Sequence, residues 1–160
     1  MARGFAEQTR GNSHMRLTTF SDYTLRALIY LALRPDVLCT IDEIAEAYDI
    51  SANHLTKVVH QAALAGEIAT MRGQGGGLRL GRPAETINIG AVLRRTEPDF
   101  AVAPCFGAGD ACAIQPGCVL QGVLGDALAA FLAVLDRTTL ADLVRPRRRL
   151  SSLLQLEPAA

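Results

Sequence analysis

The stretch of sequence that decides the fold is SANHLTKVVHQAALAGEIATMRGQGGGLRL, residues 51–80. Its first half has apolar residues at helical spacing along one stripe, namely Leu55, Val58, Val59 and Ala62. Such a stripe predicts an amphipathic helix with one buried face and a polar, basic outer face. Ser51 is a suitable N-cap for this helix, and Gly66 is a suitable stop.

The second half of the stretch predicts a β-hairpin. Strands over residues 67–72 and 78–80 would flank a glycine-rich turn at 73–77. A hairpin directly after a recognition-type helix is the wing of a winged helix-turn-helix. A nucleotide-binding loop is the alternative for the glycines, but no Lys-Ser or Lys-Thr follows them and the turn does not open a helix.

Two helices are predicted before this stretch. Residues 19–33 have an apolar stripe, and Thr19 or Ser21 can cap the helix that they form. Thr40 and Glu43 form a capping box for a short helix that ends just before the stretch quoted above. This short helix and the one that follows it make a helix-turn-helix pair.

The predicted DNA contacts lie on the second helix of that pair and on the wing. The net charge of the chain is zero, but residues 51–82 carry four basic side chains against a single glutamate. A local basic surface is typical of a small DNA-binding element, although a polar helix face that is merely solvated is the alternative. The predicted contact residues are Ser51, Asn53, His54, Thr56, Lys57, His60, Arg72, Gln74 and Arg79.

The remainder of the chain is predicted to be mainly helical. A third short strand at 86–88 precedes a helix at 89–95, and a long loop runs from 99 to 117. Residues 118–135 form a helix that is apolar on most sides, so the winged domain and a second copy of the same helix should cover it as a twofold dimer. A membrane span is the alternative, but the run is short and contains Asp126.

Three of the four cysteines lie in the long loop or at its end, with the spacing C-x6-C-x5-C: Cys105, Cys112 and Cys118. Three thiolates from one loop suit a soft metal centre, and the wide spacing fits an iron–sulfur cluster. Structural zinc is an alternative, although zinc modules use closer cysteine pairs, and a redox disulfide would leave one cysteine over. Cys39 lies among apolar residues and is interpreted as a small buried hydrophobe.

The predicted architecture is mainly α, with a winged helix-turn-helix domain, a cysteine loop and a long dimerisation helix. The N-terminus lacks the zones of a signal peptide, which indicates a cytoplasmic protein. The expected divisions are a disordered extension or tag at 1–14, the winged domain at 15–97, the cluster-binding loop at 98–118, the dimerisation helix and a short terminal helix at 119–144, and a basic flexible tail at 145–160. The basic run at 145–149 is interpreted as solvated, with DNA contact as the alternative.

Together these elements resemble the iron–sulfur winged-helix repressors, a family that includes NsrR, IscR and RirA proteins. The resemblance rests on MRLTTFSDYTLRALIYLAL (15–33), SANHLTKVV (51–59), RGQGGGLRL (72–80) and the cysteine loop before an apolar helix. It covers most of the chain, and the cysteine loop narrows it to cluster-binding members. The resemblance implies a homodimer that binds double-stranded operator DNA and represses transcription.

The fourth cluster ligand separates the branches of this family. IscR-like members use a His three residues after the third cysteine, where this chain has Gln121. NsrR-like members resemble this chain in having an Asp in the first helix, which completes the cluster from the partner subunit. Asp22 stands at that place, with Arg26 one helical turn later. Without the family, Asp22 would be interpreted as a helix-start carboxylate paired with Arg26.

The resemblance therefore favours an NsrR-type repressor that senses nitric oxide. It implies a 4Fe–4S cluster, with 2Fe–2S as the alternative, and Arg26 as a support for Asp22. The implied ligands are Cys105, Cys112, Cys118 and Asp22 of the partner subunit.

Two other functions stay open from the sequence. One is an iron- or redox-sensing regulator of the RirA-like or IscR-like type. The other is a cysteine-based enzyme, but no His, Asn or Asp constellation accompanies the cysteines. The chain is therefore predicted not to be an enzyme.

Overall fold

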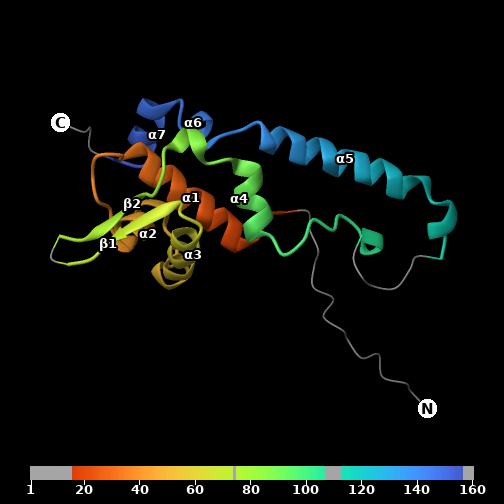
Figure 1. The fold of residues 1–160 in the computed structure, drawn as a ribbon, viewed down its shortest axis with the longest axis horizontal. Coiled ribbons are helices and arrows are strands. Elements are labelled where there is room, and N and C mark those ends of the chain that lie inside the picture. Colours follow the sequence, from red (N-terminus) through yellow and green to blue (C-terminus); the bar gives the residue numbers. More distant parts are fainter. Residues whose placement is uncertain (1–15, 74, 107–112, 157–160) are drawn as a thin grey trace, which may run out of the picture.

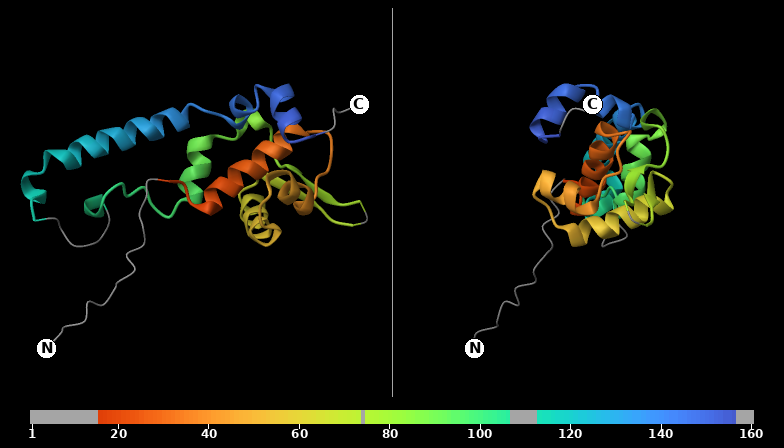
Figure 2. Two further views of the ribbon diagram at one scale, coloured as in Figure 1. Left: turned by 180° about the vertical axis from the view of Figure 1, so that it is seen from behind. Right: turned by 90° about the vertical axis from the view of Figure 1, so that its left-hand side faces the viewer.

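The computed structural model describes residues 16–73, 75–106 and 113–156. A winged domain lies at one end of the molecule, and a long helix, α5 (Val119–Asp136), extends away from it (Figure 1). The C-terminal helices return to the winged domain on one side of α1 (Thr19–Leu33), and α3 (Ala52–Leu64) lies on the other side (Figure 2). This is the mainly helical, winged-helix architecture expected from the sequence.

The first helix has the predicted bounds, Thr19–Leu33, but its N-cap is not one of the two predicted residues. Thr18, rather than Thr19 or Ser21, is the N-cap of α1, and its hydroxyl accepts a hydrogen bond from the Ser21 backbone N–H at 3.2 Å. The hydroxyl of Ser21 is completely buried and so is not available as a cap. The sequence contained several cap-competent residues in a row, and only the packing of α1 selects among them.

The helix-turn-helix pair has the predicted caps. α2 (Ile41–Tyr48) starts at the capping box of Thr40 and Glu43 and ends at Asp49, which has a left-handed backbone with φ of 51°. Ser51 then caps α3 through the backbone N–H of the first turn. Because the C-cap of one helix and the N-cap of the next are only two residues apart, the turn between them is tight and fixes the angle between α2 and α3.

The wing is a two-stranded antiparallel hairpin formed by β1 (Ile68–Met71) and β2 (Gly77–Leu80). Its register pairs Ile68 with Leu80 at the base and Met71 with Gly77 at the tip. The turn needs glycine, because Gly73 and Gly75 have φ of 110° and 81°, which other residues rarely adopt. The hairpin predicted from the sequence is therefore present. Strand β1 is one residue shorter at each end than the predicted 67–72, and β2 begins one residue before the predicted 78–80.

The third strand predicted after the wing is wrong. Ala84–Thr86 form a 3₁₀ turn, and Asn88 makes an isolated antiparallel bridge with Thr139. The side chain of Asn88 also caps α4 (Ile89–Thr96) by accepting a hydrogen bond at 2.9 Å. A single bridge between segments far apart in the sequence has no local pattern, so the sequence could not reveal it.

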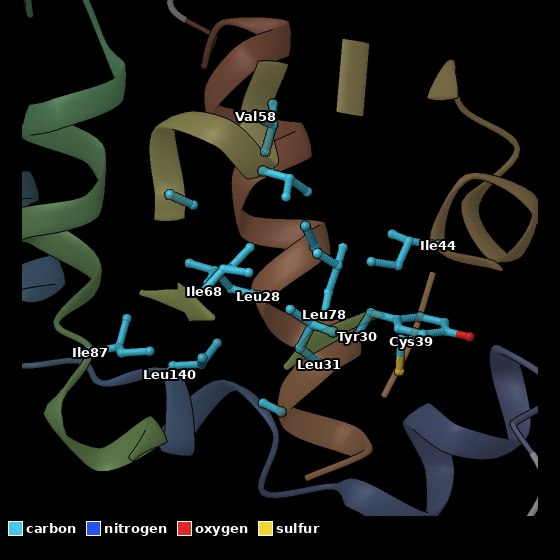
Figure 3. Close-up of a cluster of buried hydrophobic side chains, with 14 of the residues drawn as sticks. Leu28, Tyr30, Leu31, Cys39, Ile44, Val58, Ile68, Leu78, Ile87 and Leu140 are labelled. Atoms are coloured by element: carbon cyan, nitrogen blue, oxygen red, sulfur yellow. The ribbon is translucent and has the colours of Figure 1, made fainter. Parts of the chain in front are cut away.

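Helix α1 runs through the centre of the hydrophobic core. Its side chains Ala27, Leu28 and Leu31 have no exposed surface. The core also contains apolar residues from the other elements around it, including Ile44, Val58, Ile68, Leu78, Ile87 and Leu140 (Figure 3). Cys39 is completely buried among them, as predicted, and burial raises the pKa of its thiol.

Helix α5 does not receive the cover from its own winged domain that the sequence predicted. None of its residues is buried, and its main contact within the chain is with α4. That contact lies at its last turn, where Asn88 donates a hydrogen bond to the Asp136 carbonyl at 2.7 Å and Arg94 pairs with the Asp136 carboxylate. Gly90 permits this approach, because a Cβ atom there would collide with Asp136. By length and composition alone, α5 could cross a membrane.

The segment after α5 is helical, and the prediction of a flexible tail from residue 145 needs correction. The predicted terminal helix is α6 (Leu140–Leu143), and a further helix, α7 (Arg147–Leu153), follows it. Arg147 donates a hydrogen bond to the Leu33 carbonyl at 3.0 Å, which satisfies a free acceptor at the end of α1. Leu150, like other apolar residues of this segment, packs against the core, and this packing fixes the segment.

Glu67, just before β1 at the base of the wing, is a buried carboxylate. Its side chain is 4% exposed. It accepts a hydrogen bond from Arg95 of α4 and lies 3.9 Å from the Arg82 guanidinium. Burial raises the pKa of Glu67, although the two arginines oppose this shift. The charged carboxylate is therefore less favoured in the folded chain than in the unfolded chain.

We expect the Glu67→Gln variant to reveal this preference as a pH-dependent difference in stability. Because the pKa of Glu67 is raised by folding, its contribution to stability is complete below the unfolded pKa and is lost as the pH rises through the folded pKa. The wild type should therefore lose stability relative to the variant as the pH rises above about 4, the ordinary pKa of a glutamate, and through the raised pKa of the folded state. Urea unfolding of both proteins across this range measures the difference, and a difference that stayed flat or changed in the opposite direction would contradict the expectation.

Candidate DNA interface and metal centre

The outer face of α3 carries exposed polar side chains. All the residues predicted to contact DNA at this helix are exposed, namely Ser51, Asn53, His54, Thr56, Lys57 and His60. Two of their hydroxyls have local hydrogen bonds, because Ser51 caps the helix and Thr56 donates to the Ala52 carbonyl at 3.0 Å. This face therefore exposes the charge of Lys57 and the polar groups of Asn53 and His60, and a DNA duplex could contact them there.

Arg72 and Arg79 are the exposed cations of the wing. Arg79 lies on β2 opposite Ala69, and Arg72 directly follows β1. Neither forms an ion pair with a residue in the described ranges. The predicted contact Gln74 lies outside the described residues. An exposed hairpin with two unpaired arginines, next to α3 (Figure 1), can contact phosphates or enter a minor groove.

We expect Lys57→Ala to weaken binding to operator and unrelated DNA by similar factors. A lysine that contacts a phosphate contributes through counterion release, so the slope of log K against log salt should fall in magnitude by about 0.9. Fluorescence anisotropy over a salt series measures this slope. Arg137→Ala, which removes an exposed cation at the C-cap of α5 and outside the predicted contact residues, is the matched control. Equal slopes for Lys57→Ala and wild type would contradict the placement of Lys57 at the interface.

Two aromatic contacts join α1 to the helix-turn-helix pair. The rings of Tyr23 and His54 lie 6.2 Å apart, and the Arg26 guanidinium lies 5.5 Å from the centre of the Tyr48 ring. Burial raises the pKa of Tyr48 to about 12, so the ring stays neutral over the physiological range. The contacts of Tyr23 and Tyr48 could not be predicted from the sequence, because they depend on how α1 crosses α2 and α3.

Asp22 lies in the first turn of α1, next to these contacts. Its side chain is 42% exposed, and its carboxylate pairs with Arg26 at 2.8 Å. The pairing expected for a helix-start carboxylate is therefore present. The exposure of Asp22 leaves carboxylate oxygen accessible to a group outside the chain.

A polar contact, which the sequence did not predict, attaches the start of α1 to the end of α4. The Thr18 backbone N–H donates to the Glu97 carboxylate at 2.9 Å, and the buried Ser21 hydroxyl donates to Thr96 Oγ1 at 2.7 Å. Because α4 leads into the cysteine loop, this contact fixes the turn that carries Asp22 relative to the start of that loop. Paired hydroxyls at such a sequence separation give no local pattern.

The structure describes two of the three loop cysteines. Cys105 lies in the 3₁₀ turn η2 (Pro104–Phe106), and Cys118 is the N-cap of α5, after the turn η3 (Gln115–Gly117). Both are half-buried free thiols. Cys112 lies outside the described residues. Gln121 of α5 donates a hydrogen bond to the Cys105 carbonyl at 3.3 Å and so holds η2 to the start of α5.

The donor set fits an iron–sulfur cluster in its chemistry. Soft thiols at Cys105 and Cys118 are free and partly accessible, and Cys112 is on the segment between them. Within the part of the chain that the structure describes, no three metal-binding side chains come together. Asp22, Cys105 and Cys118 of one chain are therefore not one preassembled site.

A recognition-type helix followed by a basic hairpin defines a winged-helix DNA-binding protein. A sequence profile of the Rrf2 family, described as iron-dependent transcriptional regulator, matches residues 17–146. The chain is 50% identical over 145 residues to the HTH-type transcriptional regulator NsrR of Bacillus subtilis, and this match covers 89% of the chain and 99% of the relative. The chain therefore belongs to the Rrf2 family, and it is a DNA-binding transcriptional regulator.

Solved structures have the same fold. CymR from Staphylococcus aureus in its oxidized form is 29% identical, with a TM-score of 0.66 over 82% of this chain and 97% of that one. IscR from T. potens is 24% identical, with a TM-score of 0.67 over 84% of this chain and 90% of that one, and supports the fold alone. The resemblance stated from the sequence is thus confirmed at the level of the family.

Proposed function

We propose that this protein is a cytoplasmic transcriptional repressor whose affinity for operator DNA is controlled by an iron–sulfur cluster that reacts with nitric oxide. The observation that carries the proposal is the three-cysteine loop, whose first cysteine lies in η2 and whose last is the N-cap of α5. The extensive similarity to proteins named NsrR supports the same conclusion. An enzyme has less support, because the relatives reported above are transcriptional regulators.

The proposed ligands are Cys105, Cys112 and Cys118 of one subunit and Asp22 of the partner subunit. A cluster bound there, 4Fe–4S in this proposal with 2Fe–2S as the alternative, supplies iron atoms that can react with nitric oxide. The thiolates would hold iron firmly, whereas a carboxylate is a harder ligand and a weaker one for this centre. Asp22 is therefore the ligand whose bond is lost most readily.

A homodimer is part of the proposal, because α5 exposes a large apolar surface. Val119, Leu120 and Val123 are 80%, 61% and 56% exposed near its start, and Phe131 and Val134 are 47% and 54% exposed near its end. A contiguous apolar surface of this kind marks an interaction site. A second copy of α5 is the simplest cover for a self-complementary helix. The alternative cover is a lipid bilayer, which does not suit a regulator that acts on DNA.

The contacts of α1 would pass the state of Asp22 to the DNA-binding surface. Tyr23, the next residue, packs on His54 of α3, and Arg26 pairs with Asp22 and lies over Tyr48 at the end of α2. A carboxylate bound to the other subunit would hold α1, and with it the helix-turn-helix pair, at a fixed distance from the partner's pair. Such a distance matters, because paired recognition helices need half-sites about one helical turn apart.

Operator binding by three forms of the protein tests this function. We expect the cluster-loaded dimer to bind an operator duplex more tightly than the cluster-free form or the form treated with nitric oxide, by a factor between about 5 and 150. Anaerobic anisotropy titrations with each form give the affinities, and iron and sulfide counted per chain define the forms. Equal affinities for the three forms would rule out control by the cluster.

An iron-sensing regulator of the RirA-like or IscR-like type is the second candidate. It is favoured by the description of the matching family profile as iron-dependent. Gln121 weakens the IscR-like version, because its amide bonds the Cys105 carbonyl where a ligating His would be needed. An iron chelator that releases the protein from DNA as fast as nitric oxide does would favour iron sensing, whereas a response to nitric oxide alone would favour the proposal above.

A further inference from the structure

A basic groove lies between the wing and the C-terminal helices. Its volume is about 690 Å³, and β2, the residues after it, and the α6–α7 segment line it. Its charged lining residues are Arg79, Arg82, Glu85, Arg145 and Arg147. The groove is therefore positive, with one acidic side chain among the residues that line it.

The arginines of this groove differ in how much of their charge is compensated. Arg145 pairs with Asp142 at 2.6 Å, and Arg82 lies 3.9 Å from the buried Glu67. Arg79 has no acidic partner among the described residues, and neither have Arg148 and Arg149, which follow the groove on α7. Uncompensated, exposed arginines in a row are typical of a surface that meets a polyanion.

We propose that this groove, together with Arg148 and Arg149, binds phosphates of the DNA that flanks the segment contacted by the wing. Arg79 connects the two surfaces, because it lies on β2 of the wing and also lines the groove. The wing and α7 also lie at the same end of the molecule, opposite the free end of α5 (Figure 1). Because α7 lies on the other side of α1 from α3 (Figure 2), DNA reaches α7 only where it extends beyond the wing along this groove.

The groove suits a DNA backbone better than a small anion. Sites for small molecules enclose most of the surface of the ligand, and they are mostly apolar with a few polar groups. Here the side chain of Arg145 is 80% exposed, and Arg148 and Arg149 are exposed on the helix surface. Exposed arginines contribute to binding by neutralising phosphates along a duplex, which positions the protein without reading sequence.

This inference adds to the DNA interface of α3 and the wing and depends on it. The test compares wild type with the double variant Arg148→Ala/Arg149→Ala on two duplexes. One is an operator that the protein selects from a random-sequence library, trimmed to its footprint, and the other is the same operator extended by about ten base pairs on each side. Both arginines are exposed, and neither forms an ion pair with an acidic residue in the part of the chain that the structure describes. The variant should therefore have the same thermal melting curve as wild type.

We expect the double variant to lose affinity for the extended duplex only. At about 0.1 M salt the loss should be roughly tenfold, and the salt slope on that duplex should fall in magnitude by about 1.8, which corresponds to two phosphates. On the trimmed duplex, the affinity and the salt slope of the double variant should equal those of wild type. Lys57→Ala gives the contrasting pattern, because a residue of the α3 interface should affect both duplexes alike, so a failure of the main interface is distinguishable.

Three results would overturn the inference. A loss on both duplexes would indicate a general charge effect, and a loss on neither, or one no larger than that of Arg137→Ala, would leave the groove without a role in DNA binding. Titration with inorganic tripolyphosphate covers the remaining possibility. Saturable binding that the double variant abolishes, together with unchanged affinity for the extended duplex, would assign the groove to a small anion instead.

Discussion

Replacing Cys118 with serine is expected to abolish assembly of the cluster and, with it, the difference in operator affinity between reconstituted and cluster-free protein. Cys118 is the N-cap of α5, where its side chain makes no capping hydrogen bond. Serine is a good residue at an N-cap, so the substitution should keep the start of α5 intact or strengthen it. It removes one of the three proposed soft ligands, and oxygen is a poor substitute for a thiolate at such a centre.

Iron and sulfide counted per chain after anaerobic reconstitution measure the first effect. After reconstitution, the variant should bind the operator between about 5-fold and 150-fold more weakly than cluster-loaded wild type. Its affinity should equal that of cluster-free wild type. Cys39→Ala is the matched control, because Cys39 is completely buried beside Leu78 and faces the core rather than the loop. A Cys118→Ser protein with full iron content, or a Cys39→Ala protein without iron, would show that the ligands are assigned to the wrong cysteines.

The fold could be predicted from the sequence where its cause is local. The capping box of Thr40 and Glu43, the N-cap Ser51 and the glycines of the wing each specify a turn or helix end by short-range chemistry, and the structure has all of them. The predictions that failed depended on long-range contacts. Asn88 pairs with Thr139 instead of forming a strand, and α7 is held by packing against α1 instead of forming a flexible tail.

The same distinction applies to the candidate sites. The exposed face of α3 follows from helical periodicity, so its polar residues could be identified directly. Tyr23, Tyr48 and Glu97 could not, because each acts through a contact with a distant element. The basic groove is a similar case, since it combines Arg79 of the wing with arginines more than sixty positions later in the chain.

Of the four proposed ligands, Asp22 has the least support from the structure of a single chain, because there its carboxylate only pairs with Arg26. We expect Asp22→Ala to leave a cluster that forms but decays faster than in wild type, since three thiolates remain. The exposed Asp36→Ala is the control for the loss of a carboxylate. Decay is followed by anaerobic absorption spectroscopy with a chelator present, and an unchanged rate in Asp22→Ala would exclude Asp22 as a ligand.

A mixed dimer then decides whether Asp22 acts across subunits. One chain carries Cys118→Ser and the other carries Asp22→Ala, and differently tagged copies allow the mixed dimer to be isolated. If Asp22 completes the site of the partner subunit, both defects fall in the same site, and the other site keeps all four ligands. The mixed dimer should therefore hold about half the wild-type iron, and that half should decay at the wild-type rate.

If Asp22 acted within its own subunit, the remaining cluster would lack Asp22 and would decay as fast as in the Asp22→Ala dimer. The rate of decay, rather than the amount of iron, therefore separates the two arrangements, and only the wild-type rate is compatible with a cluster that connects the DNA-binding domain of one subunit to the cysteine loop of the other.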